Sequence, residues 1–129
     1  MTPELTALCL ALLLQIAQFT IYSVTAQMQV GPKAALSPRD RQIELTGTAG
    51  RAQRALNNHF EGLTLFAPAA LIIGLTGQST GYTATLAWIY LAARLAYVPA
   101  YLFGWVPWRS LIWCVGLIAT LLMILAALT

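Results

Sequence analysis

The stretch RAQRALNNHFEGLTLF, residues 51–66, joins a polar segment to an apolar one without a break. The side chains in it that carry a charge or an amide recur at spacings of 3, 4 and 3 residues. On a helix, which turns about 100° per residue, these spacings place the side chains within an arc of roughly 80°. The stretch therefore predicts a helix with one polar face, formed by Arg51, Arg54, Asn58 and Glu61.

The composition of the whole chain indicates a membrane protein. Of its 129 residues, 59% are hydrophobic and 9% are charged. A soluble domain typically has about 25% charged residues, and a soluble domain of this size cannot hide so much apolar surface from water. The N-terminal segment lacks Lys and Arg up to Gln27, and its apolar run is longer than that of a signal peptide, so we expect a retained membrane helix.

Gly and Pro divide the chain into four segments long enough to cross a bilayer core, which needs about 20 helical residues. We expect one all-α domain, 1–129, an integral membrane four-helix bundle with helices at about 3–27, 48–75, 82–103 and 108–128. The apolar part of the second helix is too short to span alone, so its polar face must lie in the membrane or at its boundary. Ionisable groups there normally face protein or a water-filled cavity, and a surplus of arginines favours an anionic partner.

The distribution of Lys and Arg predicts the orientation. Basic residues favour the cytoplasmic side of the membrane, and the short loop between the second and third helices has no charge. We therefore expect the long loop at about 28–47 to be cytoplasmic and both termini to be periplasmic, in the inner membrane. This loop is either a solvated connector or a cap over a site, and the sequence leaves both interpretations open.

Polar faces recur on the other helices. In the third helix Arg94, Tyr97 and Tyr101 are spaced by 3 and 4 residues, and Arg109 and Ser110 begin the fourth. The first helix has a milder polar face, made of Gln15, Gln18, Tyr22, Thr25 and Gln29. The expected topology brings the cytoplasmic parts of these faces to one level. The competing interpretation is structural: arginines pair with glutamate or reach the headgroups, and tyrosines anchor the chain at the membrane boundary.

Three further residues have simpler interpretations. His59 lies about 100° away from Asn58 and is expected to pack or to form an interhelical hydrogen bond. With no second ligand at a suitable spacing, no metal site is predicted. Cys9 and Cys114 lie inside apolar runs and are expected to be unpaired, small buried residues.

The motifs resemble those of the MAPEG family, the membrane-associated proteins in eicosanoid and glutathione metabolism. The family pattern Arg-x-x-Arg-Ala-x-x-Asn-x-x-Glu matches the residues from Arg51 to Glu61, and Phe66 matches the aromatic of the Pro-x-Phe segment that follows, although Thr64 stands where proline is common. The segments ARLAYVPAY and PWRS are similar to the family patterns in the third and fourth helices. The compact length is most similar to the bacterial branch.

This resemblance implies a homotrimer with sites between subunits, where many members bind glutathione as co-substrate. It implies a glutathione-dependent transferase or peroxidase acting on a lipophilic electrophile. The residues carried over for binding are Gln29, Arg51, Arg54, Asn58, Glu61, Arg94, Tyr97 and Tyr101, and Arg109 with Ser110 would be catalytic, the arginine stabilising the thiolate.

Two departures from the family pattern keep an alternative open. Gln29 stands where some glutathione-using members have an arginine, and Gly62 stands where some have a bulkier residue. The alternative is a non-catalytic trimeric membrane protein or accessory subunit, whose polar cleft is structural or holds a lipid headgroup. Under either interpretation the partners are membrane lipids and other copies of the chain, and no exposed basic run suggests a nucleic acid.

Overall fold

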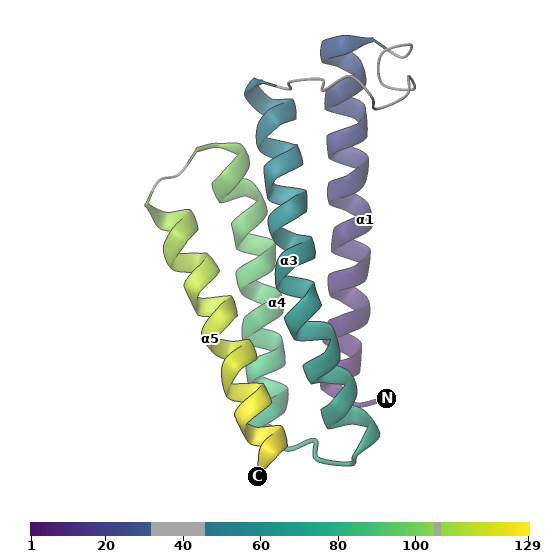
Figure 1. The fold of residues 1–129 in the computed structure, drawn as a ribbon, viewed down its shortest axis with the longest axis vertical. Helices are drawn as coiled ribbons and strands as arrows, with labels where there is room; N and C mark the ends of the chain where they lie inside the picture. Colours follow the sequence, from purple (N-terminus) through teal and green to yellow (C-terminus); the bar gives the residue numbers. More distant parts are fainter. Residues whose placement is uncertain (32–45, 105–106) are drawn as a thin grey trace.

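The described residues form four long α-helices connected in an up-and-down order (Figure 1). The computed structural model describes residues 1–31, 46–104 and 107–129. The helices are α1 (Pro3–Val30), α3 (Gly47–Leu75), α4 (Gly81–Leu102) and α5 (Trp108–Leu128). Both termini lie at one end of the bundle, together with the short turn between α3 and α4 (Figure 1).

The helices follow the predicted order, and their ends differ from expectation most clearly in α1. This helix continues to Val30 instead of ending near Gln27, and its backbone turns at Gly31, where φ is 85°. Glycine adopts a positive φ without steric cost, so it suits the end of a helix. The rest of the expected loop, with Lys33, Arg39 and Arg41, lies in 32–45, outside the described residues.

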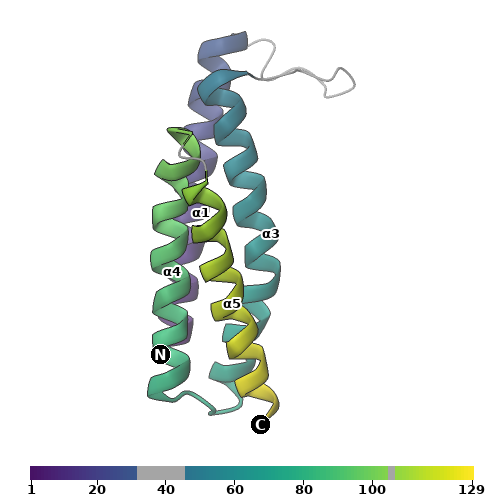
Figure 2. The same cartoon turned by 90° about the vertical axis from the view of Figure 1, so that its left-hand side faces the viewer.

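The bundle has α3 and α4 as its central pair. Both α1 and α5 pack against this pair, from opposite sides (Figure 2). At the end away from the termini, α1 and α3 project beyond α4 and α5 (Figure 1). The end of α4 therefore meets α3 several residues after α3 begins, at the level of Arg51, whose Nη1 donates to Leu102 O at 3.3 Å.

The helices have the length and the surface of membrane spans. By length and apolarity alone, α1, α3 and α5 could each cross a membrane. Because α3 and α5 run in the same direction, the chain must return between them. The 22 residues of α4 extend about 33 Å at 1.5 Å per residue, enough for that return. Large apolar side chains are exposed along the outer surface, among them Leu13, Ile16, Phe19, Ile72, Ile118 and Leu121.

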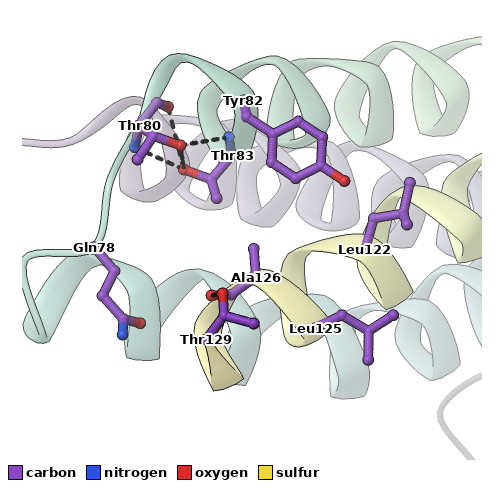
Figure 3. Close-up of a pocket in the computed structure, with 8 residues that line it drawn as sticks. All are labelled: Gln78, Thr80, Tyr82, Thr83, Leu122, Leu125, Ala126 and Thr129. Atoms are coloured by element: carbon purple, nitrogen blue, oxygen red, sulfur yellow. Dashed lines mark hydrogen bonds between the residues drawn. The ribbon is translucent and has the colours of Figure 1, made fainter.

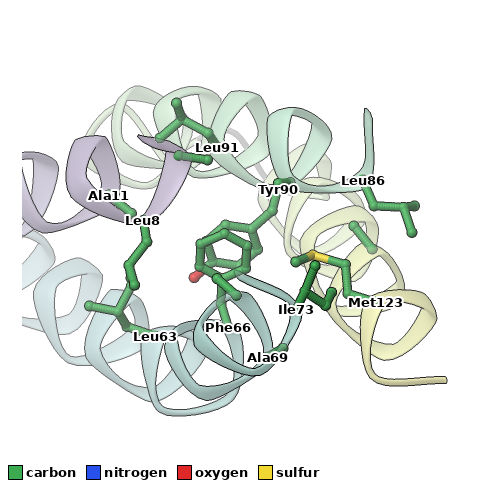
Figure 4. Packing of buried hydrophobic residues seen from close by; sticks show 14 residues of the cluster. Leu8, Ala11, Leu63, Phe66, Ala69, Ile73, Leu86, Tyr90, Leu91 and Met123 are labelled. Carbon is green, nitrogen blue, oxygen red and sulfur yellow. The ribbon is translucent and has the colours of Figure 1, made fainter. Parts of the chain in front are cut away.

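The core packs alanines and larger apolar side chains around one aromatic stack. Phe66 and Tyr90 lie parallel, with ring centroids 3.9 Å apart, and buried alanines of α1, α3, α4 and α5 surround them (Figure 4). A Cβ on Gly74 would lie 2.8 Å from Leu5 Cδ1, so the Leu5 side chain of α1 packs against α3 where Gly74 leaves room for it. Small residues at such contacts are typical of helices packed within membranes.

The two cysteines correct one expectation. Both Cys9 and Cys114 are free thiols, as expected, but both are exposed on the surface of the chain. The expectation that they are buried is therefore wrong. The physical reason is that a helix apolar on all sides does not show which face meets its neighbours and which meets lipid.

The end of the bundle that holds the termini contains a buried carboxylate. Glu4 is fully buried and accepts hydrogen bonds from Ser79 Oγ, at 2.8 and 3.1 Å, and from Thr83 Oγ1, at 2.5 Å. Thr80 and Thr83 also cap the start of α4 reciprocally (Figure 3). An open pocket of about 480 Å³ lies beside them, lined by α5 on its other side (Figure 3). Glu4 thus fastens α1 to the start of α4.

Candidate functional site

The candidate site is organised around Arg94 of α4, which is only 3% exposed. Its Nε donates to His59 Nδ1 at 3.3 Å, and its Nη1 donates to Asn58 Oδ1 at 2.9 Å. Its guanidinium carbon lies 4.5 Å from the centre of the Tyr97 ring, a cation–π contact. The competing interpretation required Arg94 to reach the lipid headgroups. Instead, Arg94 joins α3 to α4 inside the bundle.

His59 connects this cluster to α1. Its Nε2 lies 3.0 Å from Ala11 O, a carbonyl that can only accept. An arginine can only donate, so Nδ1 must be the acceptor towards Arg94 and Nε2 must carry the proton. The imidazole is therefore neutral in this arrangement. The prediction of an interhelical hydrogen bond for His59 is confirmed.

A second cluster gathers around Tyr101, near the end of α4. Arg54 Nε donates to Tyr101 Oη at 3.0 Å, and the guanidinium carbon of Arg109 lies 4.7 Å from the centre of the Tyr101 ring. The Tyr97 and Tyr101 ring centroids are 5.6 Å apart, which joins the two clusters. Side chains from α3, α4 and α5 thus form one continuous network.

Four residues from the sequence-based set lie outside this network. Arg51 is one of them, because its only hydrogen bond within the described part of the chain is to the carbonyl oxygen of Leu102. Gln29 Nε2 donates to Thr46 O and Oγ1, both at 3.0 Å, and Gln29 Oε1 accepts from Thr46 N at 3.1 Å. This contact joins the end of α1 to the N-cap of α3, on the part of the bundle that projects beyond α4. Glu61 and Ser110 are both exposed on the single chain.

The network carries excess positive charge. Within residues 1–31, 46–104 and 107–129, no carboxylate lies within ion-pair distance of the arginines at 51, 54, 94 and 109. The ion pair between Arg54 and Glu61, which their spacing would allow, is therefore not formed. Arg54 donates to the hydroxyl of Tyr101 instead. Of these arginines Arg94 is buried, Arg109 is half-buried, and Arg51 and Arg54 are exposed. Because a buried charge is normally paired and guanidiniums bind carboxylates well, this part of the described chain suits an anionic ligand.

Sequence reasoning missed one residue beside this cluster, Tyr90. It is 2% exposed, and its hydroxyl has no hydrogen-bond partner among the described residues. A sequence signal exists, because Tyr90 precedes Arg94 by four residues and so extends the polar face of the third helix by one turn. This signal is weak, because Tyr90 lies within the largely apolar segment from Leu86 to Leu91.

Together, the fold and the network define an all-α membrane protein with a cationic site in the half of the bundle away from the termini. The MAPEG family model matches residues 4–129, and the chain belongs to this family. The family includes glutathione transferases and peroxidases. No curated protein and no solved structure matches the chain.

Proposed function

We propose that the protein is a glutathione-dependent transferase or peroxidase that acts on lipophilic electrophiles arriving from the bilayer. The observation that carries this proposal is the convergence of Arg54 and Arg109 on Tyr101, with no carboxylate of the described residues within ion-pair distance of either arginine. Glutathione has two carboxylates, one amine and one thiol. A set of arginines with one glutamate, Glu61, matches those groups in charge.

The proposed roles follow from the chemistry of each side chain. Arg51, Arg54 and Glu61 hold the charged ends of glutathione, helped by the amide of Asn58. Arg94, Tyr97 and Tyr101 shape the wall behind it, and Gln29 contributes at the margin. When bound, glutathione supplies a sulfur nucleophile, which is reactive as the thiolate.

Arg109 is the proposed catalytic residue. It lies in the first turn of α5, where the free N–H groups and the helix dipole already favour an anion. A guanidinium there lowers the pKa of a nearby thiol by stabilising its charged form. Ser110, the next residue, can donate a hydrogen bond to the sulfur.

The proposal includes a homotrimer with sites between subunits. Arg51, Arg54, Glu61 and Ser110 are exposed on the single chain, so a neighbouring copy could complete and cover the site. The arginines of the described chain also lie away from the end that holds the termini, which supports cytoplasmic placement of that half in the inner membrane. A native mass measurement in detergent that finds only monomers would contradict the assembly.

The experiment that tests the function is a titration of the purified protein with glutathione by calorimetry, with the dimethyl ester of glutathione as matched control. We expect saturable binding of glutathione and much weaker binding of the ester, because the ester lacks the carboxylates that the arginines would hold. If the wild-type protein binds neither compound, the non-catalytic alternative replaces the proposal. The observation that favours this alternative is that the Gln29 amide is already hydrogen-bonded to Thr46 and not directed to a ligand.

A further inference from the structure

The pocket beside the capped start of α4 lies at the end of the bundle that holds the termini. Its other wall is formed by the last turns of α5, and its volume is about 480 Å³ (Figure 3). The polar part of its lining includes Gln78, Thr80, Tyr82 and Thr83, and the apolar part includes Leu122 and Leu125. None of the residues assigned to glutathione lines this pocket, so a ligand bound there is independent of the proposed function.

The inner wall of this pocket presents hydrogen-bond acceptors. Gln78 Oε1 is buried and has no hydrogen-bond partner among the described residues. Thr83, only 3% exposed, donates its hydroxyl proton to Glu4 at 2.5 Å, so its oxygen offers only lone pairs to the pocket. A buried polar group without a partner is costly, so this wall suits a ligand that donates hydrogen bonds.

The charge behind this wall is negative. Glu4 is fully buried and lies one hydrogen bond behind Thr83, and both of its oxygens accept hydrogen bonds, as in a carboxylate. In residues 1–31, 46–104 and 107–129, no lysine or arginine lies within ion-pair distance of Glu4. Glu4 itself does not line the pocket, but its charge favours a cation on the far side of Thr83.

The outer part of the pocket has a different character. Tyr82, in the first turn of α4, is 54% exposed, and its hydroxyl can donate a hydrogen bond. A tyrosine near a helix end is typical of the boundary between membrane and water. On α5, Leu125 lines the pocket and is 49% exposed, so the pocket continues into the apolar outer surface. From inside to outside, the pocket therefore offers acceptors, a donor and an apolar surface.

We propose that this pocket binds a phospholipid with a primary ammonium headgroup, phosphatidylethanolamine. The ammonium donates to Gln78 Oε1 and Thr83 Oγ1, the phosphate accepts from Tyr82 Oη, and the acyl chains lie along Leu122 and Leu125. A primary ammonium has N–H groups for these acceptors, whereas the trimethylated nitrogen of phosphatidylcholine has none. The volume corresponds to roughly 16 waters at about 30 Å³ each, enough for the headgroup and the first carbons of its chains.

The test is native mass spectrometry of the purified protein in detergent, without glutathione, after incubation with equal amounts of phosphatidylethanolamine and phosphatidylcholine of the same acyl chains. We expect one retained lipid per chain, with phosphatidylethanolamine in about tenfold excess. Gln78→Leu should lower this preference about threefold to tenfold, because it removes the buried acceptor and keeps the volume. Gln53→Leu, the same change at a half-buried glutamine in the other half of α3, should leave it unaltered. Tyr82→Phe should weaken retention of both lipids and keep their ratio, because both have the phosphate.

A second measurement needs no variant. Wild type should retain N-methylated and N,N-dimethylated phosphatidylethanolamine progressively less well, because each methyl group removes one N–H donor. The proposal is overturned if wild type retains the dimethylated lipid or phosphatidylcholine as well as phosphatidylethanolamine, or if folded Gln78→Leu keeps the full preference. It is also overturned if no oligomer of the wild type retains either lipid, because a neighbouring copy of the chain then covers the pocket.

Discussion

The two halves of the bundle each bury an ionisable side chain, and they treat it in opposite ways. Near the termini, Glu4 is surrounded by hydroxyl donors from Ser79 and Thr83, and both of its oxygens are occupied. In the other half, Arg94 contacts Asn58, His59 and the ring of Tyr97, yet its Nη2 has no hydrogen-bond partner among the described residues. Both residues join α4 to another helix.

This difference separates a structural role from a binding role. A buried charge whose hydrogen-bonding groups are all satisfied holds helices together and offers nothing to a ligand. A buried charge that retains a free donor, beside further cations, can still bind a ligand through that donor. Glu4 therefore stabilises the fold, and the half around Arg94 is the one suited to recognition of an anion.

The two glutamates of the described chain offer the sharpest test of this division. Glu4→Ala should lower the free energy of unfolding by about 1–3 kcal/mol, because it leaves buried hydroxyls without their acceptor. Glutathione affinity of the folded fraction should not change. Glu61→Ala, at an exposed position, should change stability by less than about 0.5 kcal/mol but weaken glutathione binding roughly tenfold or more.

Thermal unfolding followed by circular dichroism in detergent, together with calorimetric titration, measures both effects on the same samples. Glu4→Gln is the matched control, since it keeps an acceptor and should lose less stability than Glu4→Ala. The division of roles fails if Glu61→Ala unfolds the protein, or if folded Glu4→Ala no longer binds glutathione.

A smaller effect is expected at Tyr101, where Arg54 and Arg109 meet. Tyr101→Phe keeps the ring that Arg109 covers and removes the hydroxyl that Arg54 bonds. Because Arg54 then loses its orientation, glutathione affinity should fall about threefold to tenfold, the equivalent of one ordinary hydrogen bond. Tyr22→Phe, on α1, is the control. Equal affinities of Tyr101→Phe and wild type would show that the Arg54–Tyr101 contact does not position a ligand.

The smallest effect is expected at Gln29. Gln29→Ala should weaken glutathione binding by no more than about threefold, because its amide is already committed to Thr46. The same change should cost about 1 kcal/mol of stability through the lost hydrogen bonds at the start of α3. Calorimetry and thermal unfolding measure the two quantities. A loss of affinity of tenfold or more would place Gln29 inside the site.

Most of the fold could be predicted from the sequence, because long apolar segments between Gly and Pro specify membrane helices directly. The spacing of Arg51, Arg54 and Asn58 also revealed the polar face of α3. What could not be predicted was which apolar face meets protein and which meets lipid, since both environments select the same side chains. For this reason Cys9 and Cys114 were expected to be buried, although both are exposed.

The candidate site was predictable only in part. Helical periodicity shows which side chains share a face, and it placed Arg94, Tyr97 and Tyr101 together. It does not show which faces of different helices meet, so the bond from Arg94 to His59 and the free hydroxyl of Tyr90 required the structure. Gln29 shares its face with the polar residues of α1, but its amide bonds to the start of α3 instead of joining the network.

The measurement that tests the central claim most directly is an ultraviolet titration of the glutathione thiolate bound to wild type, Arg109→Ala and Arg51→Ala. Removing the cation at 109 should raise the pKa of the bound thiol by about one unit, which lowers the ratio of thiolate to thiol about tenfold at any given pH and corresponds to about 1.4 kcal/mol. Arg51→Ala should weaken binding without raising this pKa, because its proposed partner is a carboxylate. An unchanged thiol pKa in Arg109→Ala that still binds glutathione would contradict the assignment.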